Sequence, residues 1–195
     1  MTILITGICG FVGSAIARGL REEWPSAKIC GIDSLIRRGS ETNVTKLEAI
    51  GVGVQIGDIR NRDDLEGLPK ADWVIDCAAN PSVLAGVDRK TSPRELLDHN
   101  LVGTIELLEL CRARESGFIL LSTSRVYSIP PLARMDVRIE NHAFVPEPAS
   151  FGTGMSEQGV AEDFSTVPPL SLYGNSKLCS ELLALEYGET FGFPV

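Results

Sequence analysis

The chain has few of the residues that build metal sites and disulfide frameworks. Its five cysteines are widely spaced and form no CxxC pair, and its two histidines, His99 and His142, lack metal-ligand spacing. This pattern argues against a zinc centre and against a disulfide scaffold. We therefore expect no bound metal and a reducing compartment.

Positive charge and long apolar runs are also scarce. The 195 residues carry 18 lysines and arginines against 26 aspartates and glutamates, which gives a formal net charge of −8. Such a chain repels a polyanion, so we expect no nucleic-acid partner. No apolar stretch approaches the ~20 residues of a membrane span, and the N-terminus lacks a basic leader region. We expect no membrane partner and a cytoplasmic location.

Short apolar runs alternate with longer amphipathic stretches along the chain. Near-continuous runs such as WVIDCA and FILLS are typical of strands covered on both faces. The strands that we predict are Ile3–Thr6, Lys28–Ile32, Gly53–Ile56, Trp73–Cys77 and Phe118–Ser122. The helices that we predict are Phe11–Glu23, Glu41–Ala49, Asp63–Leu68, Pro93–Arg114 and Leu172 to about Thr190. This alternation predicts one α/β domain over residues 1–195, with a doubly wound parallel sheet and helices on both faces.

The alternation stops between about residues 128 and 170. Prolines and glycines recur there without a sustained period, so we expect a long irregular insertion, which either shapes a substrate site or makes no contacts. In the last predicted helix Leu178, Leu182 and Leu185 follow one another at helical spacing. The final letters FGFPV predict the start of one more strand.

Three glycines, Gly7, Gly10 and Gly13, lie in the stretch TGICGFVG between the first strand and the first helix. In a dinucleotide site the first glycine permits a tight turn, the second lets the backbone approach the pyrophosphate, and the third lets helix and strand pack closely. The pyrophosphate then meets the free N–H groups and the positive dipole end of the helix. The pattern predicts a dinucleotide-binding loop.

An acidic residue, Asp33, closes the second predicted strand twenty residues beyond the third glycine. A carboxylate at this place accepts hydrogen bonds from an adenosine ribose and repels a 2′-phosphate, which favours NAD. The neighbouring Arg37 and Arg38 leave NADP open.

The stretch YGNSK places Tyr173 and Lys177 on one face of the last helix. A free tyrosine hydroxyl ionises near pH 10, so a phenolate base working near neutrality needs a cation beside it. An adjacent lysine ammonium and an oxidised nicotinamide supply that charge. A tyrosine and lysine pair is common on helix surfaces, so the glycine loop is what turns it into a candidate for catalysis.

Taken in order, these motifs resemble the extended short-chain dehydrogenase/reductase family of NAD-dependent sugar epimerases and dehydratases. The matching stretches are TGICGFVG, Asp33, GDIR at 57–60, CAA at 77–79, NLVGT at 100–104, STSRVY at 122–127 and YGNSK. The resemblance implies a Rossmann-type fold, NAD as cofactor and a nucleotide-sugar substrate. It also implies a homodimer formed through the two helices predicted at 93–114 and 172–190.

The resemblance further implies a set of cofactor contacts: Gly7, Gly10, Phe11, Val12, Gly13, Asp33, Ser34, Arg38, Asp58, Ile59, Ala78, Ala79, Asn100, Ser122, Tyr173 and Lys177. Within this set Asp58 and Ile59 face the adenine, Ala78 and Ala79 line the groove, and Asn100 supports the site from behind. The implied catalytic residues are Thr123, Tyr173 and Lys177. The hydroxyl that bonds the reacting sugar is that of Thr123, with Ser122 or Ser124 as alternatives.

The residues after Thr123 indicate the reaction. Sugar dehydratases of this family carry Asp-Glu there to expel water, whereas this chain has Ser124 and Arg125. We therefore expect epimerisation through a transient keto sugar. The stretch DSLIRRGSETN resembles the CDP-paratose 2-epimerases, or CDP-tyvelose epimerases, which implies inversion at C2 of a CDP-linked dideoxyhexose. A UDP-sugar 4-epimerase and a catalytically incompetent NAD-binding fragment are the alternatives.

Three departures from the family pattern accompany this assignment. Ile8 stands where a second glycine is frequent and is expected to crowd the pyrophosphate turn, and Ser128 replaces the glycine that follows VY. Members of the family continue into further strands and a smaller C-terminal substrate domain. We expect the sheet to be truncated before these elements, which puts turnover by the 195-residue form in question.

Overall fold

A computed structural model describes residues 1–87 and 91–195. Its centre is a five-stranded sheet in which every strand pairs in parallel, in the order β3-β2-β1-β4-β5. The strands are β1 (Thr2–Thr6), β2 (Lys28–Asp33), β3 (Gly53–Ile56), β4 (Trp73–Asp76) and β5 (Gly117–Leu120). The order reverses between β1 and β4, and ligands of such sheets bind in the crevice at that point. The predicted doubly wound sheet is confirmed.

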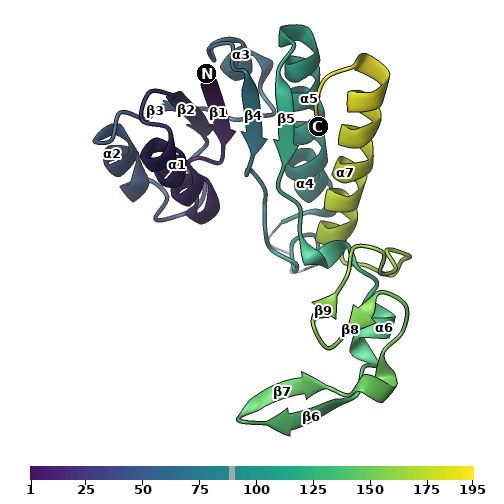
Figure 1. The fold of residues 1–195 in the computed structure, drawn as a ribbon. Helices are drawn as coiled ribbons and strands as arrows, with labels where there is room; N and C mark the ends of the chain where they lie inside the picture. The colour runs from purple at the N-terminus through teal and green to yellow at the C-terminus, as the bar shows by residue number, and fades with distance from the viewer. Residues whose placement is uncertain (88–90) are drawn as a thin grey trace.

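Helices cover both faces of this sheet (Figure 1). They are α1 (Phe11–Glu23), α2 (Thr42–Glu48), α3 (Arg62–Glu66), α4 (Pro93–Leu97), α5 (Gly103–Arg114) and α7 (Leu172–Phe191). Successive residues of β1 point to opposite faces, so Ile3 and Ile5 join a core with α1 and α2, while Leu4 joins a core with α3, α5 and α7. This two-sided burial explains why the strands read as continuous apolar runs.

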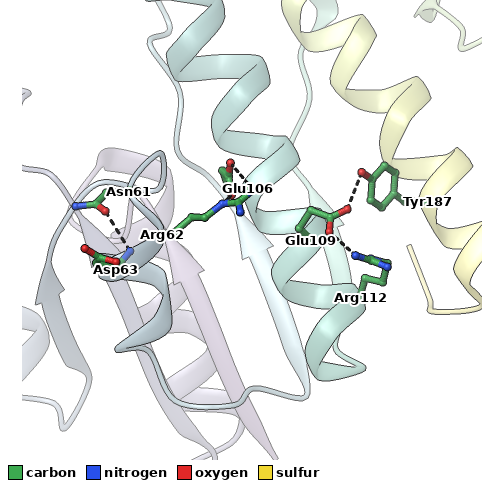
Figure 2. A network of polar contacts seen from close by, with 7 residues as sticks. All are labelled: Asn61, Arg62, Asp63, Glu106, Glu109, Arg112 and Tyr187. Atoms are coloured by element: carbon green, nitrogen blue, oxygen red, sulfur yellow. Dashed lines mark hydrogen bonds and ion pairs between the residues drawn. The ribbon is translucent and has the colours of Figure 1, made fainter.

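Polar contacts link α3, α5 and α7 at the edge of the second core, as Figure 2 shows. Arg62 of α3 pairs with Glu106 of α5 at 2.7 Å. One turn further along α5, Glu109 accepts hydrogen bonds from Arg112 and from the Tyr187 hydroxyl of α7, at 2.6 and 2.9 Å. The hydrogen bond to Glu109 raises the pKa of Tyr187. These contacts link the three helices at the margin of the core.

The helix predicted over 93–114 is interrupted. Ser92 caps α4 by accepting a hydrogen bond from the Glu95 N–H, as Ser and Pro at these positions favour. A π-helical turn, η1 (Asp98–Val102), then separates α4 from α5. Such turns insert an extra residue where tertiary contacts demand it, and here the turn contains the buried Asn100.

The segment predicted to be irregular contains short elements that the sequence reading missed. They are η2 (Ser124–Val126), α6 (Ile129–Ala133), β6 (Val137–Glu140), β7 (Ala143–Pro146), η3 (Pro148–Ser150), β8 (Met155–Ser156) and β9 (Gly159–Val160). The strands form two antiparallel hairpins, and Figure 1 shows that the segment extends away from the sheet. We call this segment, residues 128–170, the arm. Ser128 stands where the family pattern has glycine, and its hydroxyl connects the two ends of the arm by donating to the Val167 carbonyl at 2.6 Å.

One further expectation is corrected. Residues 192–195 form no strand of their own, although the Pro194 carbonyl accepts a hydrogen bond from the Phe118 N–H of β5 at 2.8 Å. Of the leucines at helical spacing in α7, Leu182 and Leu185 are both about three-fifths exposed. None of the helices that the structure describes is long and apolar enough to cross a bilayer.

We predict that Leu107→Ala lowers the free energy of unfolding by about 2–5 kcal/mol, because this fully buried α5 side chain leaves a cavity under the sheet. Ile139→Ala is the control, since it removes the same number of carbon atoms from a β6 position that is about three-quarters exposed and should change stability by less than about 0.5 kcal/mol. Urea denaturation followed by circular dichroism measures both. Equal losses would contradict the assignment of the core.

Candidate functional site

A groove of about 750 Å³ runs along the carboxyl ends of the parallel strands. It is lined by the loops that follow β1, β2, β3, β4 and β5, and by the first turns of α1 and α7. Because the groove crosses the point where the strand order reverses, it lies where doubly wound sheets bind nucleotides.

The glycines of the β1–α1 loop are required by close backbone contacts. Gly7 has φ +59°, which favours glycine, and a methyl group on it would lie 3.0 Å from backbone atoms of Cys77 and Ala78. A methyl group on Gly13 would overlap the Gly7 carbonyl. At these glycines the backbone itself borders the groove, with no side chain in between.

Helix α1 starts at this loop without a side-chain cap, because its N-cap residue is Gly10. Among the described residues nothing accepts a hydrogen bond from the backbone N–H groups of Phe11, Val12 or Gly13. Free N–H groups at the positive end of a helix dipole are an anion site. The loop fits a pyrophosphate.

Ile8 does not crowd this turn, contrary to expectation. Its side chain is fully buried in the core beneath α1 and packs where Gly31 of β2 leaves room. The side chain points away from the groove because the turn at Gly7, with its positive φ, breaks the alternation of β1 and places Ile8 in the core that contains Ile3 and Ile5.

The carboxylate of Asp33 connects the glycine loop after β1 with the loop after β2. It accepts hydrogen bonds from the N–H groups of Cys9 and Leu35, each at 2.9 Å. The second bond holds Leu35 at φ +55°, a strained conformation for a residue with a branched side chain. Asp33 lines the groove and retains acceptor capacity for a ligand hydroxyl.

Tyr173 and Lys177 both line the groove from the first turns of α7 and are almost fully buried, at 8% and 2% exposure. Burial lowers the pKa of the Lys177 ammonium, and the negative charge of Asp76 opposes this effect. Among the described residues no acceptor lies within hydrogen-bonding distance of that ammonium. A buried cation without a partner fits a site that receives hydroxyls from a ligand.

Gly174 explains how α7 can begin so close to the end of β5. A methyl group on this residue would overlap the carbonyl of Arg125 in η2. Ser171 caps the helix by accepting a hydrogen bond from the Gly174 N–H at 2.9 Å. The glycine between Tyr173 and the rest of the motif is therefore a packing requirement, which the sequence analysis missed.

Asp58, in the loop after β3, and His99 also line the groove. Arg60 donates to both carboxylate oxygens of Asp58, and this hydrogen bonding lowers the pKa of Asp58. His99 of η1 lines the same groove, and neither of its buried ring nitrogens has a hydrogen-bond partner among the described residues. The sequence analysis treated His99 as an ordinary polar residue, and only tertiary structure reveals its place.

The structure brings most of the predicted cofactor contacts to the groove. Those that line it are Gly7, Gly10, Phe11, Val12, Gly13, Asp33, Ser34, Asp58, Ile59, Ala78, Ala79, Ser122, Tyr173 and Lys177. Arg38 does not line it, whereas Arg37 does, because the β2–α2 loop turns the preceding arginine inward. Thr123 is also outside the lining, and its hydroxyl accepts a hydrogen bond from the Arg125 N–H at 3.2 Å.

Asn100 lies behind the groove rather than in its lining. Its amide accepts a hydrogen bond from the Asn80 N–H at 2.7 Å and donates to the Asn80 carbonyl and to the Ser176 hydroxyl. The residue therefore joins the loop after β4 to helix α7.

A second cavity of about 450 Å³ lies between the end of β5 and the arm. Ser124, Arg125, Tyr127 and Ser171 contribute polar groups to it, and Val83 with residues of the arm contributes apolar surface. None of the described residues that line this cavity carries a carboxylate.

Comparison with known proteins gives consistent matches. A sequence model of the NAD dependent epimerase/dehydratase family matches residues 3–195. CDP-paratose 2-epimerase of Salmonella typhi is 28% identical, over 98% of this chain and 54% of that protein. dTDP-glucose 4,6-dehydratase of Streptomyces antibioticus is 30% identical, over 100% of this chain and 51% of that protein.

Among solved structures, UDP-glucuronic acid 4-epimerase of Bacillus cereus in complex with UDP-glucuronic acid and NAD is 28% identical with a TM-score of 0.74. The match covers 100% of this chain and 54% of that one. The chain thus spans about half the length of the relatives that it matches.

We predict opposite effects for two glycine-to-alanine changes in helices. Gly174→Ala should lower the midpoint of thermal unfolding, because its methyl group overlaps the Arg125 carbonyl. Gly19→Ala in α1 meets no atom within 4 Å and should raise stability by about 0.5–1 kcal/mol. Thermal unfolding of the three chains measures this, and a stabilised Gly174→Ala would refute the close contact between α7 and η2.

Proposed function

The chain belongs to the NAD-dependent epimerase/dehydratase family, and from this premise we propose that it is the NAD-binding part of a nucleotide-sugar epimerase. The observation that carries the proposal is the burial of Tyr173 and Lys177 together at the end of a groove whose other wall is a glycine loop. A base beside a dinucleotide site is what reversible oxidation of a sugar hydroxyl requires.

NAD is the cofactor of this family, and the residues of the groove fit it. The free N–H groups of Phe11 and Val12 would hold the pyrophosphate, and Asp33 would accept hydrogen bonds from the adenosine ribose. The ring of His99 and the loop that contains Asp58 border the part of the groove that we assign to the adenine. Bound NAD supplies a reversible acceptor for the hydride of the sugar carbon.

The chemistry of the chain itself is assigned to α7. Tyr173 takes the proton of the sugar hydroxyl as a phenolate, and the positive charge of Lys177 stabilises that phenolate. Lys177 would also donate hydrogen bonds to the nicotinamide ribose of bound NAD. Burial of both side chains keeps water from competing for these contacts.

Epimerisation is favoured over loss of water. Elimination needs an acid and a base near the hydroxyl residue, and the turn after β5 offers Ser124 and Arg125 instead. We assign the second cavity, which adjoins this turn, to the sugar. Thr123 is the proposed hydroxyl that bonds it, next to both linings, and the alternatives are Ser122, which lines the groove, and Ser124, which lines the second cavity. The substrate of choice is a CDP-linked dideoxyhexose inverted at C2, in keeping with the Salmonella relative.

A UDP-sugar 4-epimerase is the second candidate, favoured by the Bacillus cereus structure. The 195-residue form alone, as a unit that binds NAD without turnover, is the third. We also propose a cytoplasmic location and a homodimer through residues 93–114, which form α4, η1 and α5, and through α7. The exposed Leu182 and Leu185 on α7 provide apolar surface for such a contact.

The identity of the dinucleotide is testable on this chain. We predict that it binds NAD⁺ about tenfold or more tightly than NADP⁺, because Asp33 repels a 2′-phosphate. Asp33→Asn should reduce this ratio, and Arg37→Ala should increase it, since Arg37 lines the groove. Isothermal titration with both dinucleotides measures the ratios, and Asp63→Asn, at an exposed carboxylate of α3, is the control. A ratio that Asp33→Asn leaves unchanged would reject the role of Asp33.

Turnover is tested in the complete gene product. Tyr173→Phe should lower kcat by about 100-fold or more while NAD⁺ binding changes little, because the ring keeps its packing and loses only the ionisable hydroxyl. Tyr187→Phe is the matched control, since it removes the hydroxyl of a tyrosine on the same helix that lines neither cavity. Epimerisation of CDP-linked and UDP-linked hexoses, followed by chromatography, gives the rates and the substrate. Full activity of Tyr173→Phe would eliminate it as the base.

A further inference from the structure

A buried carboxylate lies under the groove at the end of β4. Asp76 is 1% exposed, and it occupies the register position opposite Thr6 of β1. Its Oδ1 accepts hydrogen bonds from the Thr6 hydroxyl at 2.6 Å and from the Ala78 N–H at 3.1 Å. The Thr104 hydroxyl lies 3.3 Å from its Oδ2. Among the described residues no lysine or arginine comes within ion-pair distance of it.

The polar contacts continue from Asp76 to the helix that carries Lys177. Thr104 donates to the Asn100 carbonyl at 2.9 Å, and the Ser180 hydroxyl lies within 3.1 Å of the same carbonyl and 3.4 Å of the Thr104 hydroxyl. Ser180 and Thr104 are buried almost completely. A continuous buried polar chain therefore joins β1, β4, α5 and α7.

A buried carboxylate is costly unless a positive charge or several hydrogen bonds compensate for it. Lys177, the buried cation of the groove, faces Asp76 from α7, Cys77 from the loop after β4, and Glu181 from the next turn of its own helix. Of these three the negative charge of Asp76 has the largest effect in favour of the charged lysine, against the effect of burial. Asp76 and Lys177 are the two charged side chains that are buried among the described residues, and the polar chain from Asp76 reaches Ser180, three residues after Lys177 on the same helix.

We propose that Asp76 is a positioning residue for the reaction: through its negative charge it keeps the buried Lys177 protonated, and through its hydrogen bonds it aligns β4 with α7. It does not line the groove and touches no reacting atom. The catalytic meaning of this charge rests on the proposed function, whereas the pairing of the two charges does not.

The test separates charge from hydrogen bonding. In Asp76→Asn the amide oxygen still accepts from Thr6 and Ala78, and the amide nitrogen can donate to the Thr104 hydroxyl, so the polar chain is retained without the charge. Thr104→Val does the reverse, since it removes a hydrogen bond and leaves both charges. Glu181→Gln removes the other carboxylate that faces Lys177.

The measurement is the pH titration of Lys177 by NMR in the 195-residue chain labelled with ¹³C-lysine, with the signal assigned from its loss in Lys177→Arg. Asp76→Asn should move the pKa of Lys177 further below its ordinary value, and by more than Glu181→Gln does. Thr104→Val should lower thermal stability and leave the titration nearly in place. NAD⁺ titrations of the same samples report separately on the proposed function.

Three results would overturn the inference. One is a folded Asp76→Asn in which Lys177 titrates as in the wild type, and another is a Thr104→Val that shifts the titration as far as Asp76→Asn. The third is a wild-type Lys177 that is already uncharged at neutral pH, a result that stands even where Asp76→Asn does not fold. If the wild-type chain does not bind NAD⁺ but the lysine titrations are as predicted, the proposed function is rejected and the pairing of charges is kept.

Discussion

Helix α7 brings its first turn against the backbone of η2, and this contact places the two side chains to which we assign the chemistry. The approach is possible because Gly174 has no side chain where the Arg125 carbonyl lies. With the helix seated there, Tyr173 and Lys177 are buried and face the same groove as the glycine loop of β1. A helix held further from the sheet would leave both side chains in water and outside the groove.

A buried polar layer where η1, α5 and α7 meet supports this arrangement. Asn100 bonds the backbone of Asn80 on one side and the Ser176 hydroxyl on the other. The π-helical turn η1 lets that amide reach both partners. Apolar packing alone would allow α7 to slide, whereas directional hydrogen bonds in a low-dielectric interior fix one register. The energetic cost of burying these groups is met by mutual pairing, and the site gains a fixed geometry.

Much of this architecture was predictable from the sequence, because the signals are local. The alternation of short apolar runs with amphipathic stretches predicted the sheet, and the spacing of Gly7, Gly10 and Gly13 predicted the loop that the structure contains. The β6–β7 hairpin was also detectable in principle, since VRIE and AFVP flank Asn141 and His142, whose positive φ angles are typical of a tight hairpin turn. The choice of Arg37 over Arg38, the orphaned ring of His99 and the role of Gly174 depend on contacts between distant segments, which no local pattern encodes.

The central claim is that one groove holds a dinucleotide with its reactive end at Tyr173 and Lys177. A crystal structure of the chain grown with NAD⁺ tests it most directly. The account predicts a pyrophosphate at the N–H groups of Phe11 and Val12, and ribose hydroxyls within hydrogen-bonding distance of Tyr173 and Lys177. A dinucleotide bound in the opposite direction, or bound outside this groove, would contradict the account.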